Sequence, residues 1–313
     1  MAEHRSGFAA VVGRPNVGKS TLMNALVGQK VAIMSARPQT TRRVIRGVVT
    51  RPDSQLILVD TPGLHRPRTL LGQRLNDLVR EALGEVDVIA FCLPADQKIG
   101  PGDRHIASML APAMTGRRAV PVVAVVTKAD LVDRAGMAEH LLAVDALAGE
   151  NNVEWAAIVP VSAKEGFQVD AIADVLAGFL PEGPVLYPDG EITDEPEQVM
   201  VAELVREAAL EGVRDELPHS LAVVVEEIVE REDSGDPETG RKPLLDVRVN
   251  LYVERPSQKA IVIGRGGARL RDVGTKARKD IERLLGSRVY LDLHVKVAKD
   301  WQSNPKQLRK LGF

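Results

Sequence analysis

The chain has 313 residues, of which 44% are hydrophobic, enough to bury a sizeable core, and we expect two domains. A single cysteine excludes a disulfide framework, and no apolar run reaches the length of a membrane span, so we expect a cytoplasmic protein. The net charge of −2 is unevenly distributed: residues 244–313 hold 16 Lys and Arg against 7 Asp and Glu, a balance of +9 that leaves −11 elsewhere.

The first part of the chain alternates strand-like apolar runs with helical stretches. This alternation is typical of an α/β fold, a mostly parallel sheet with helices on both faces. Ligands of such sheets bind beyond the carboxyl ends of the strands, so the turns after the strands are the places to search. The predicted strands are residues 8–12, 43–50 (an edge strand), 55–60, 86–93, 120–127 and 156–160.

The first of these strands leads into a phosphate-binding loop with the sequence GRPNVGKS at residues 13–20. In such a loop, successive backbone N–H groups surround phosphate oxygens, and a lysine supplies a positive charge. We expect Lys19 to supply that charge and Ser20 to bind Mg²⁺ through its hydroxyl. The other predicted nucleotide-binding residues here are Gly13, Asn16, Val17, Gly18 and Thr21.

Two later segments complete the expected phosphate site. Asp60 ends a predicted strand and is placed to hold Mg²⁺ through water, while the amide of Gly63 is placed to sense the γ-phosphate. Thr41 lies in a polar stretch ahead of an edge strand and is our candidate for a switch ligand of Mg²⁺. Leu64 occupies a position where related switches carry a water-orienting glutamine, so we expect slow intrinsic hydrolysis.

Two more turns, each after a strand, offer groups that read guanine. Asp130 supplies a carboxylate able to accept both ring N–H groups, and residues 162–164 can place backbone donors on the guanine oxygen. Phosphate loop, Asp60 and these two turns, in this order, are typical of GTPases rather than ATPases. Thr127 departs from the usual asparagine, so we expect the base to be bound more weakly or braced differently, while Asp130 keeps the guanine-reading role. The predicted base-site residues are Thr127, Lys128, Asp130, Ser162, Ala163 and Lys164.

The proline- and glycine-rich stretch after residue 180 cannot continue a helix, so it marks a domain boundary. We expect a GTPase domain over residues 1–182, a linker over 183–196 and a second domain over 197–313. In the second domain the patterns predict a helix at 197–217, strands at 221–230 and 244–254, a basic helix to about residue 285 and a strand at 289–297. This order predicts a small α+β domain.

A glycine loop, Gly264 to Gly267, joins an apolar segment to the basic helix. In a KH domain such a loop has no side chains where the nucleic-acid backbone approaches, and a neighbouring apolar groove seats about four nucleotides. The alternatives are a helix-capping turn for the loop and a solvated face for the basic charge. The predicted RNA-binding residues are Lys259, Ile261, Gly264, Arg265, Gly266, Gly267, Arg269, Arg271, Lys276 and Arg278.

These motifs together resemble the Era family, bacterial GTPases with a C-terminal type II KH domain. The resemblance rests on the phosphate loop, residues 38–42, 60–63 and 261–267, and the closing segments 290–297 and 299–301, so it spans nearly the whole chain. It implies binding near the 3′ end of small-subunit ribosomal RNA, a role in assembling that subunit, and peripheral association with the inner membrane. We expect a monomer.

In related GTPases, an asparagine at the position of Asn16 helps to hold a potassium ion where others insert an arginine. Here Asn16 is either a K⁺ ligand that assists catalysis together with Lys19, Thr41 and Gly63, or purely structural. Two other functions are considered: the GTPase component of a tRNA-modification system, and a membrane-associated signalling GTPase. The first would need a cofactor-binding or nucleophilic domain and the second lipidation or an amphipathic anchor, and the sequence predicts none of these.

Overall fold

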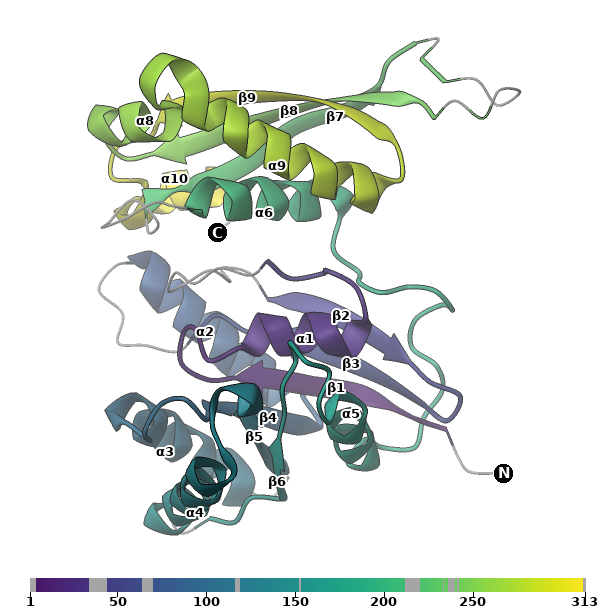
Figure 1. Ribbon diagram of the computed structural model, residues 1–313, viewed down its shortest axis with the longest axis vertical. Helices are drawn as coiled ribbons and strands as arrows, with labels where there is room; N and C mark the ends of the chain where they lie inside the picture. The colour runs from purple at the N-terminus through teal and green to yellow at the C-terminus, as the bar shows by residue number, and fades with distance from the viewer. Residues whose placement is uncertain are drawn as a thin grey trace. The chain divides into compact units, whose positions relative to one another are not determined.

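The computed structural model of the chain describes residues 4–33, 44–63, 70–115, 119–151, 153–211, 220–232, 234–235, 240 and 242–311. The chain divides into two compact units: the main body of the first ends at Asp194, and that of the second begins at Glu195 (Figure 1). Each unit has its own sheet. Among the described helices, none combines the length and the hydropathy that a membrane span requires.

The first unit is a P-loop type α/β domain. Its strands pair in the order β2-β3-β1-β4-β5-β6, and only β2 is antiparallel to its neighbour. The elements are β1 (Arg5–Val12), α1 (Lys19–Val27), β2 (Ile45–Thr50), β3 (Ser54–Asp60), α2 (Leu70–Gly84), β4 (Val88–Pro94), α3 (Pro101–Thr115), β5 (Val122–Thr127), the 3-10 turn η1 (Ala129–Leu131), α4 (Arg134–Glu150), β6 (Ala157–Pro160) and α5 (Val169–Gly178).

Helices cover both faces of this sheet, as the predicted fold class requires (Figure 1). Helices α2, α3 and α4 contribute to one apolar cluster with the central strands, while α1 and α5 contact each other and the strands β1 and β3. Strands β3 and β4 are buried along their whole length. Burial raises the pKa of the Cys92 thiol in β4 to about 12, so this cysteine stays protonated and is a packing residue.

The connector between the two units, residues 183–194, lies on the first unit. The Gln55 side chain is fully buried, and its Oε1 accepts hydrogen bonds from the amides of Leu186 (2.7 Å) and Tyr187 (2.8 Å). Further along, the amide of Val48 in β2 donates to the Ile192 carbonyl at 2.9 Å. The connector therefore pairs with the outer edge of β2, the strand at the end of the sheet.

The second unit places two helices against one face of a three-stranded sheet. Strand β8 is antiparallel to β7 and parallel to β9, in the order β7-β8-β9. The elements are α6 (Glu197–Leu210), β7 (Ala222–Glu230), β8 (Leu244–Val253), α8 (Pro256–Ile263), the 3-10 turn η2 (Arg265–Gly267), α9 (Ala268–Leu285), β9 (Arg288–Val297), the 3-10 turn η3 (Trp301–Ser303) and α10 (Pro305–Lys310). Helix α6 ends at Leu210, earlier than the sequence predicts.

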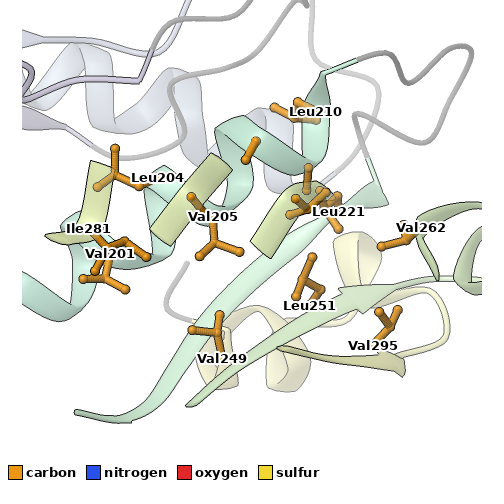
Figure 2. Close-up of a cluster of buried hydrophobic side chains, with 14 of the residues drawn as sticks. Val201, Leu204, Val205, Leu210, Leu221, Val249, Leu251, Val262, Ile281 and Val295 are labelled. Atoms are coloured by element: carbon orange, nitrogen blue, oxygen red, sulfur yellow. The ribbon is translucent and has the colours of Figure 1, made fainter. Parts of the chain in front are cut away.

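The core of this unit follows from the periodicity of α9. Its buried residues Val273, Ala277 and Ile281 recur every four positions and form one stripe, with a basic face opposite. Figure 2 shows Ile281 beside Val201 of α6, with the strand residue Val249 nearby. The glycine loop forms η2, which directly precedes α9. The packing of α9 on the sheet therefore also fixes the position of this loop.

Candidate functional site

The phosphate loop, residues 13–20, joins the end of β1 to the start of α1, as its sequence predicts. Gly13 and Gly18 have positive φ angles of 151° and 100°, and Asn16 has a left-handed φ of 64°. A Cβ atom on Gly13 would lie 2.8 Å from the Cys92 carbonyl oxygen of β4. The loop therefore needs glycine at this position to pass so close to the neighbouring strand.

The lysine of this loop is folded back over it. Lys19 is only 6% exposed, and its Nζ donates to the carbonyl oxygens of Gly13 (3.2 Å) and Arg14 (2.9 Å). Burial lowers the pKa of Lys19, while the nearby Asp60 carboxylate opposes that shift. The buried ammonium group thus lies against the phosphate loop, where a bound phosphate would add a further counter-charge.

Two oxygen donors suited to a magnesium ion meet beside this lysine. Ser20 Oγ donates to Asp60 Oδ2 at 2.7 Å, and Asp60, at the end of β3, is fully buried. Hydroxyl and carboxylate oxygens are the donor types that Mg²⁺ prefers, and it usually takes further ligands from water and substrate phosphates. Within the described residues no group of three or more His, Cys, Asp or Glu could hold a metal alone. Ser20 and Asp60 therefore fit a metal that arrives with a nucleotide.

The turn after β3 approaches the phosphate loop closely. A Cβ atom on Gly63 would lie 2.9 Å from the backbone nitrogen of Pro15, so only glycine fits here without displacing the loop. This contact puts the Gly63 backbone beside the phosphate loop, in agreement with its predicted role. The predicted switch ligand Thr41 and the departure at Leu64 lie outside the described residues.

Most of the residues predicted to read the base line one pocket together with residues of the phosphate loop and α1. The pocket has a volume of about 250 Å³, and we call it the base pocket. Gly18 and Thr21 reach it from the phosphate loop and α1, and predicted residues of the two later turns also line it. Five predicted residues therefore line the pocket, namely Thr127, Lys128, Asp130, Ala163 and Lys164, and the sixth, Ser162, is not part of its lining.

A neighbouring hydroxyl group, that of Ser162, holds the Asp130 carboxylate in place. Ser162 Oγ donates to Asp130 Oδ1 at 2.6 Å, and this hydrogen bond is the main cause of the lowered pKa of Asp130. A carboxylate with a lowered pKa stays ionised at neutral pH and accepts hydrogen bonds only. Asp130 can therefore accept two ring N–H groups, as guanine presents and adenine does not.

Thr127 braces the phosphate loop rather than facing solvent. It is 5% exposed at the end of β5, and its Oγ1 donates to the Val17 carbonyl at 2.5 Å. This bond ties the loop that would hold phosphate to the strand that carries the base-reading turn. The sequence shows the departure from asparagine at this position but not the partner, which lies 110 residues away.

In the second unit, the glycine loop has the backbone conformation that its sequence predicts. Gly264, Gly266 and Gly267 have φ angles of 73°, 57° and 76°. A Cβ atom on Gly264 would meet the Cβ of Arg269 at 2.7 Å, whereas one on Gly266 would meet nothing within 4 Å. The loop is therefore open at Gly266, and Ile261 on the preceding helix leaves 52% of its surface exposed.

The predicted RNA-binding cations fall into two groups. Arg269 Nη2 donates to the carbonyls of Ala209 (3.1 Å) and Glu211 (2.8 Å), and Lys276 forms an ion pair with the Glu211 carboxylate. Both side chains thus stabilise the C-terminal end of α6, a structural role that sequence reasoning missed. In contrast, Arg265 and Arg271 are exposed, Lys259 is half-buried, and Arg278 is exposed with Glu282 at 4.0 Å.

Two family models match the chain. One describes a 50S ribosome-binding GTPase and matches residues 8–128, and the other describes a KH domain and matches residues 216–302. The GTPase Era of Streptomyces coelicolor is 67% identical over 99% of this chain and 95% of its own length. The GTPase Era of Mycobacterium avium is 64% identical, with both chains fully covered.

Two solved structures share the whole fold. A crystal structure of Era in complex with MgGDPNP and nucleotides 1506–1542 of 16S ribosomal RNA superposes with a TM-score of 0.89 at 36% identity, covering 99% of both chains. An Aquifex aeolicus Era variant bound to GDP and AlF4⁻ also has a TM-score of 0.89, at 35% identity, and covers 98% of this chain and 99% of its own.

Proposed function

This chain belongs to the Era family of GTPases, and on that premise we propose that it hydrolyses GTP in order to control an RNA-binding KH domain during assembly of the small ribosomal subunit. One observation carries the proposal. The Era structure that matches 99% of this chain contains both MgGDPNP and a fragment of 16S ribosomal RNA. We assign this chain the same two kinds of ligand, GTP or GDP on the first unit and the 3′ end of small-subunit RNA on the second.

The base pocket and the phosphate loop support the nucleotide part of the proposal. Asp130 accepts two hydrogen bonds from guanine, and the hydrogen bond from Ser162, which lowers the pKa of Asp130, holds the carboxylate in place. Backbone amides of the phosphate loop and the ammonium of Lys19 bind the β- and γ-phosphates. The close approach of Gly63 to this loop supports a role for its amide in sensing the γ-phosphate.

Magnesium fits the donors at this site, and Ser20, Asp60 and the predicted switch residue Thr41 are the residues that would hold it. When bound, the ion neutralises charge that develops on the phosphates during transfer. Ser20 and Asp60 are already within hydrogen-bond distance, so the chain presents both oxygens on the same side of the phosphate loop.

Potassium at Asn16 stays a prediction, alongside a purely structural role for that asparagine. Asparagine tolerates the left-handed conformation that residue 16 adopts better than most side chains, which by itself explains its presence. Leu64 cannot orient water, so we retain slow intrinsic hydrolysis as an expectation.

For the RNA, the backbone at Arg265 and Gly266 would lie against phosphates, while Ile261 offers an apolar surface for bases. Arg271, Arg278 and Lys259 would add electrostatic attraction, and Arg269 and Lys276 would act mainly through α6. Peripheral membrane association is a further prediction that the family resemblance supports, and residence in the cytoplasm and a monomeric state also stay predictions.

Copurification tests the proposal against its alternatives. The full chain, loaded with GDPNP and Mg²⁺, is incubated with a mixture of small ribosomal subunits, tRNA and vesicles of anionic phospholipid. We expect it to sediment with the small subunits in a GDPNP-dependent manner. Retention on tRNA alone would favour a tRNA-modification GTPase, and retention on vesicles alone would favour a membrane-bound signalling GTPase; either result would refute the proposal.

A further inference from the structure

An ion pair that the proposed function does not use joins the phosphate loop to α3. Arg14 Nε donates to Asp103 Oδ1 at 2.7 Å. The Asp103 carboxylate is fully buried, while the Arg14 side chain is about one quarter exposed. A buried carboxylate is costly unless it is paired and hydrogen-bonded, so Asp103 needs a partner such as Arg14.

The first turn of α3 is shaped around this arginine. The second oxygen of Asp103, Oδ2, accepts a hydrogen bond from the Gly100 amide at 2.9 Å, so both carboxylate oxygens are used. A Cβ atom on Gly102 would lie 2.5 Å from Arg14 Cδ, and its absence gives the arginine room to pass. Arg14 Nη2 donates to Gln97 Oε1 at 3.2 Å, which fixes the other end of the guanidinium.

On its other side, the same arginine belongs to the phosphate loop. Its carbonyl oxygen accepts the 2.9 Å hydrogen bond from Lys19 Nζ. Two residues later, Asn16 turns into the left-handed conformation that curls the loop. The side chain of Arg14 therefore fixes the peptide group that orients the lysine expected to meet the phosphates.

We infer that Asp103 is a positioning residue for nucleotide binding, which acts through Arg14 and holds the phosphate loop in its binding shape before the nucleotide arrives. A pre-formed loop loses less conformational freedom on binding, and so binds more tightly. The inference rests on the proposed nucleotide site. Because the Arg14–Asp103 ion pair acts on the phosphate loop, its loss should weaken the binding of GDP and GTP alike and leave the preference for guanine unchanged.

The first variant is Arg14→Ala, which leaves the Gly100 bond to Asp103 in place. Its control is Arg104→Ala, which removes an arginine of α3 that forms an exposed ion pair with Glu150 and donates to the Ile99 carbonyl. We expect Arg14→Ala to weaken binding of fluorescent GDP and of a non-hydrolysable GTP analogue by about tenfold each. KM for GTP should rise by the same factor, with kcat changed by less than about twofold. The control should bind as the wild type does.

A second variant keeps the test decisive if Arg14→Ala folds poorly. Asp103→Asn retains an oxygen for the Gly100 amide but loses the charge that Arg14 meets. Single and double variants form a cycle, and we expect the double variant to bind no more weakly than Arg14→Ala alone. If Asp103→Asn binds GDP and GTP as tightly as the wild type does and differs only in a lower melting temperature, the ion pair merely caps α3 and the inference is refuted. Failure of the wild type itself to bind guanine nucleotides would instead refute the proposed function.

Discussion

Thr127 offers the sharpest test of how the two halves of the nucleotide site are joined. Its hydroxyl donates to the Val17 carbonyl at 2.5 Å, and both residues are buried. Thr127→Val keeps the shape of the side chain and removes only the hydroxyl, so the carbonyl loses its donor. An unsatisfied buried polar group costs about 1–3 kcal/mol, which corresponds to a factor of about 5 to 150 in an equilibrium constant.

We expect this cost to appear as faster release of bound nucleotide, because the phosphate loop is no longer tied to β5. Stopped-flow displacement of a fluorescent GDP measures the rate directly. Thr127→Ser keeps the hydroxyl and is the matched control, and it should release GDP at close to the wild-type rate. The preference for guanine over xanthine should be unchanged, since Asp130 and Ser162 are untouched. If Thr127→Val releases GDP at the wild-type rate, the bracing role of Thr127 is refuted.

Three further predictions concern the base, the catalytic ion and the RNA. Asp130→Asn should shift binding from GTP toward xanthosine triphosphate in competition assays, and unchanged GTP affinity would disprove the assignment. If Asn16 holds potassium, replacing K⁺ by Na⁺ should slow phosphate release strongly in the wild type and little in Asn16→Ala; equal wild-type rates in both salts would exclude the ion. Gly266→Asp should abolish filter binding of the 3′-end RNA, because a carboxylate at this position would repel the approaching phosphates. It should leave GTP binding intact, because residue 266 has open space around it and lies outside the nucleotide-binding unit. Gly286→Asp, with a φ of 65° and equally open surroundings, is its control.

Local motifs could be predicted from the sequence because their geometry depends on neighbouring residues. The phosphate loop follows from glycines at positions 13 and 18, and the glycine loop from three glycines within four residues. The buried strand β4 follows from its unbroken apolar run. In each case, a conformation that few residues tolerate, or a run that needs burial, leaves little choice.

Contacts between distant residues could not be predicted in this way. Arg269 has the charge and position of an RNA contact, yet its guanidinium binds carbonyls at the end of α6, about 60 positions earlier. Asp103 is an ordinary acidic residue in the first turn of a helix, and only the fold brings Arg14 to it. The early end of α6 at Leu210 likewise shows that apolar periodicity alone does not fix a helix boundary.

The connector on β2 has a consequence for any shortened form of this protein. An open edge strand carries unpaired amides and carbonyls that can pair with another molecule, and proteins usually cover such edges. Here the cover is the connector itself, through the Val48 bond to Ile192 and the buried Gln55 amide. A chain ended after residue 182 would expose both and invite edge-to-edge aggregation, whereas one ended after Asp194 keeps its own edge protected.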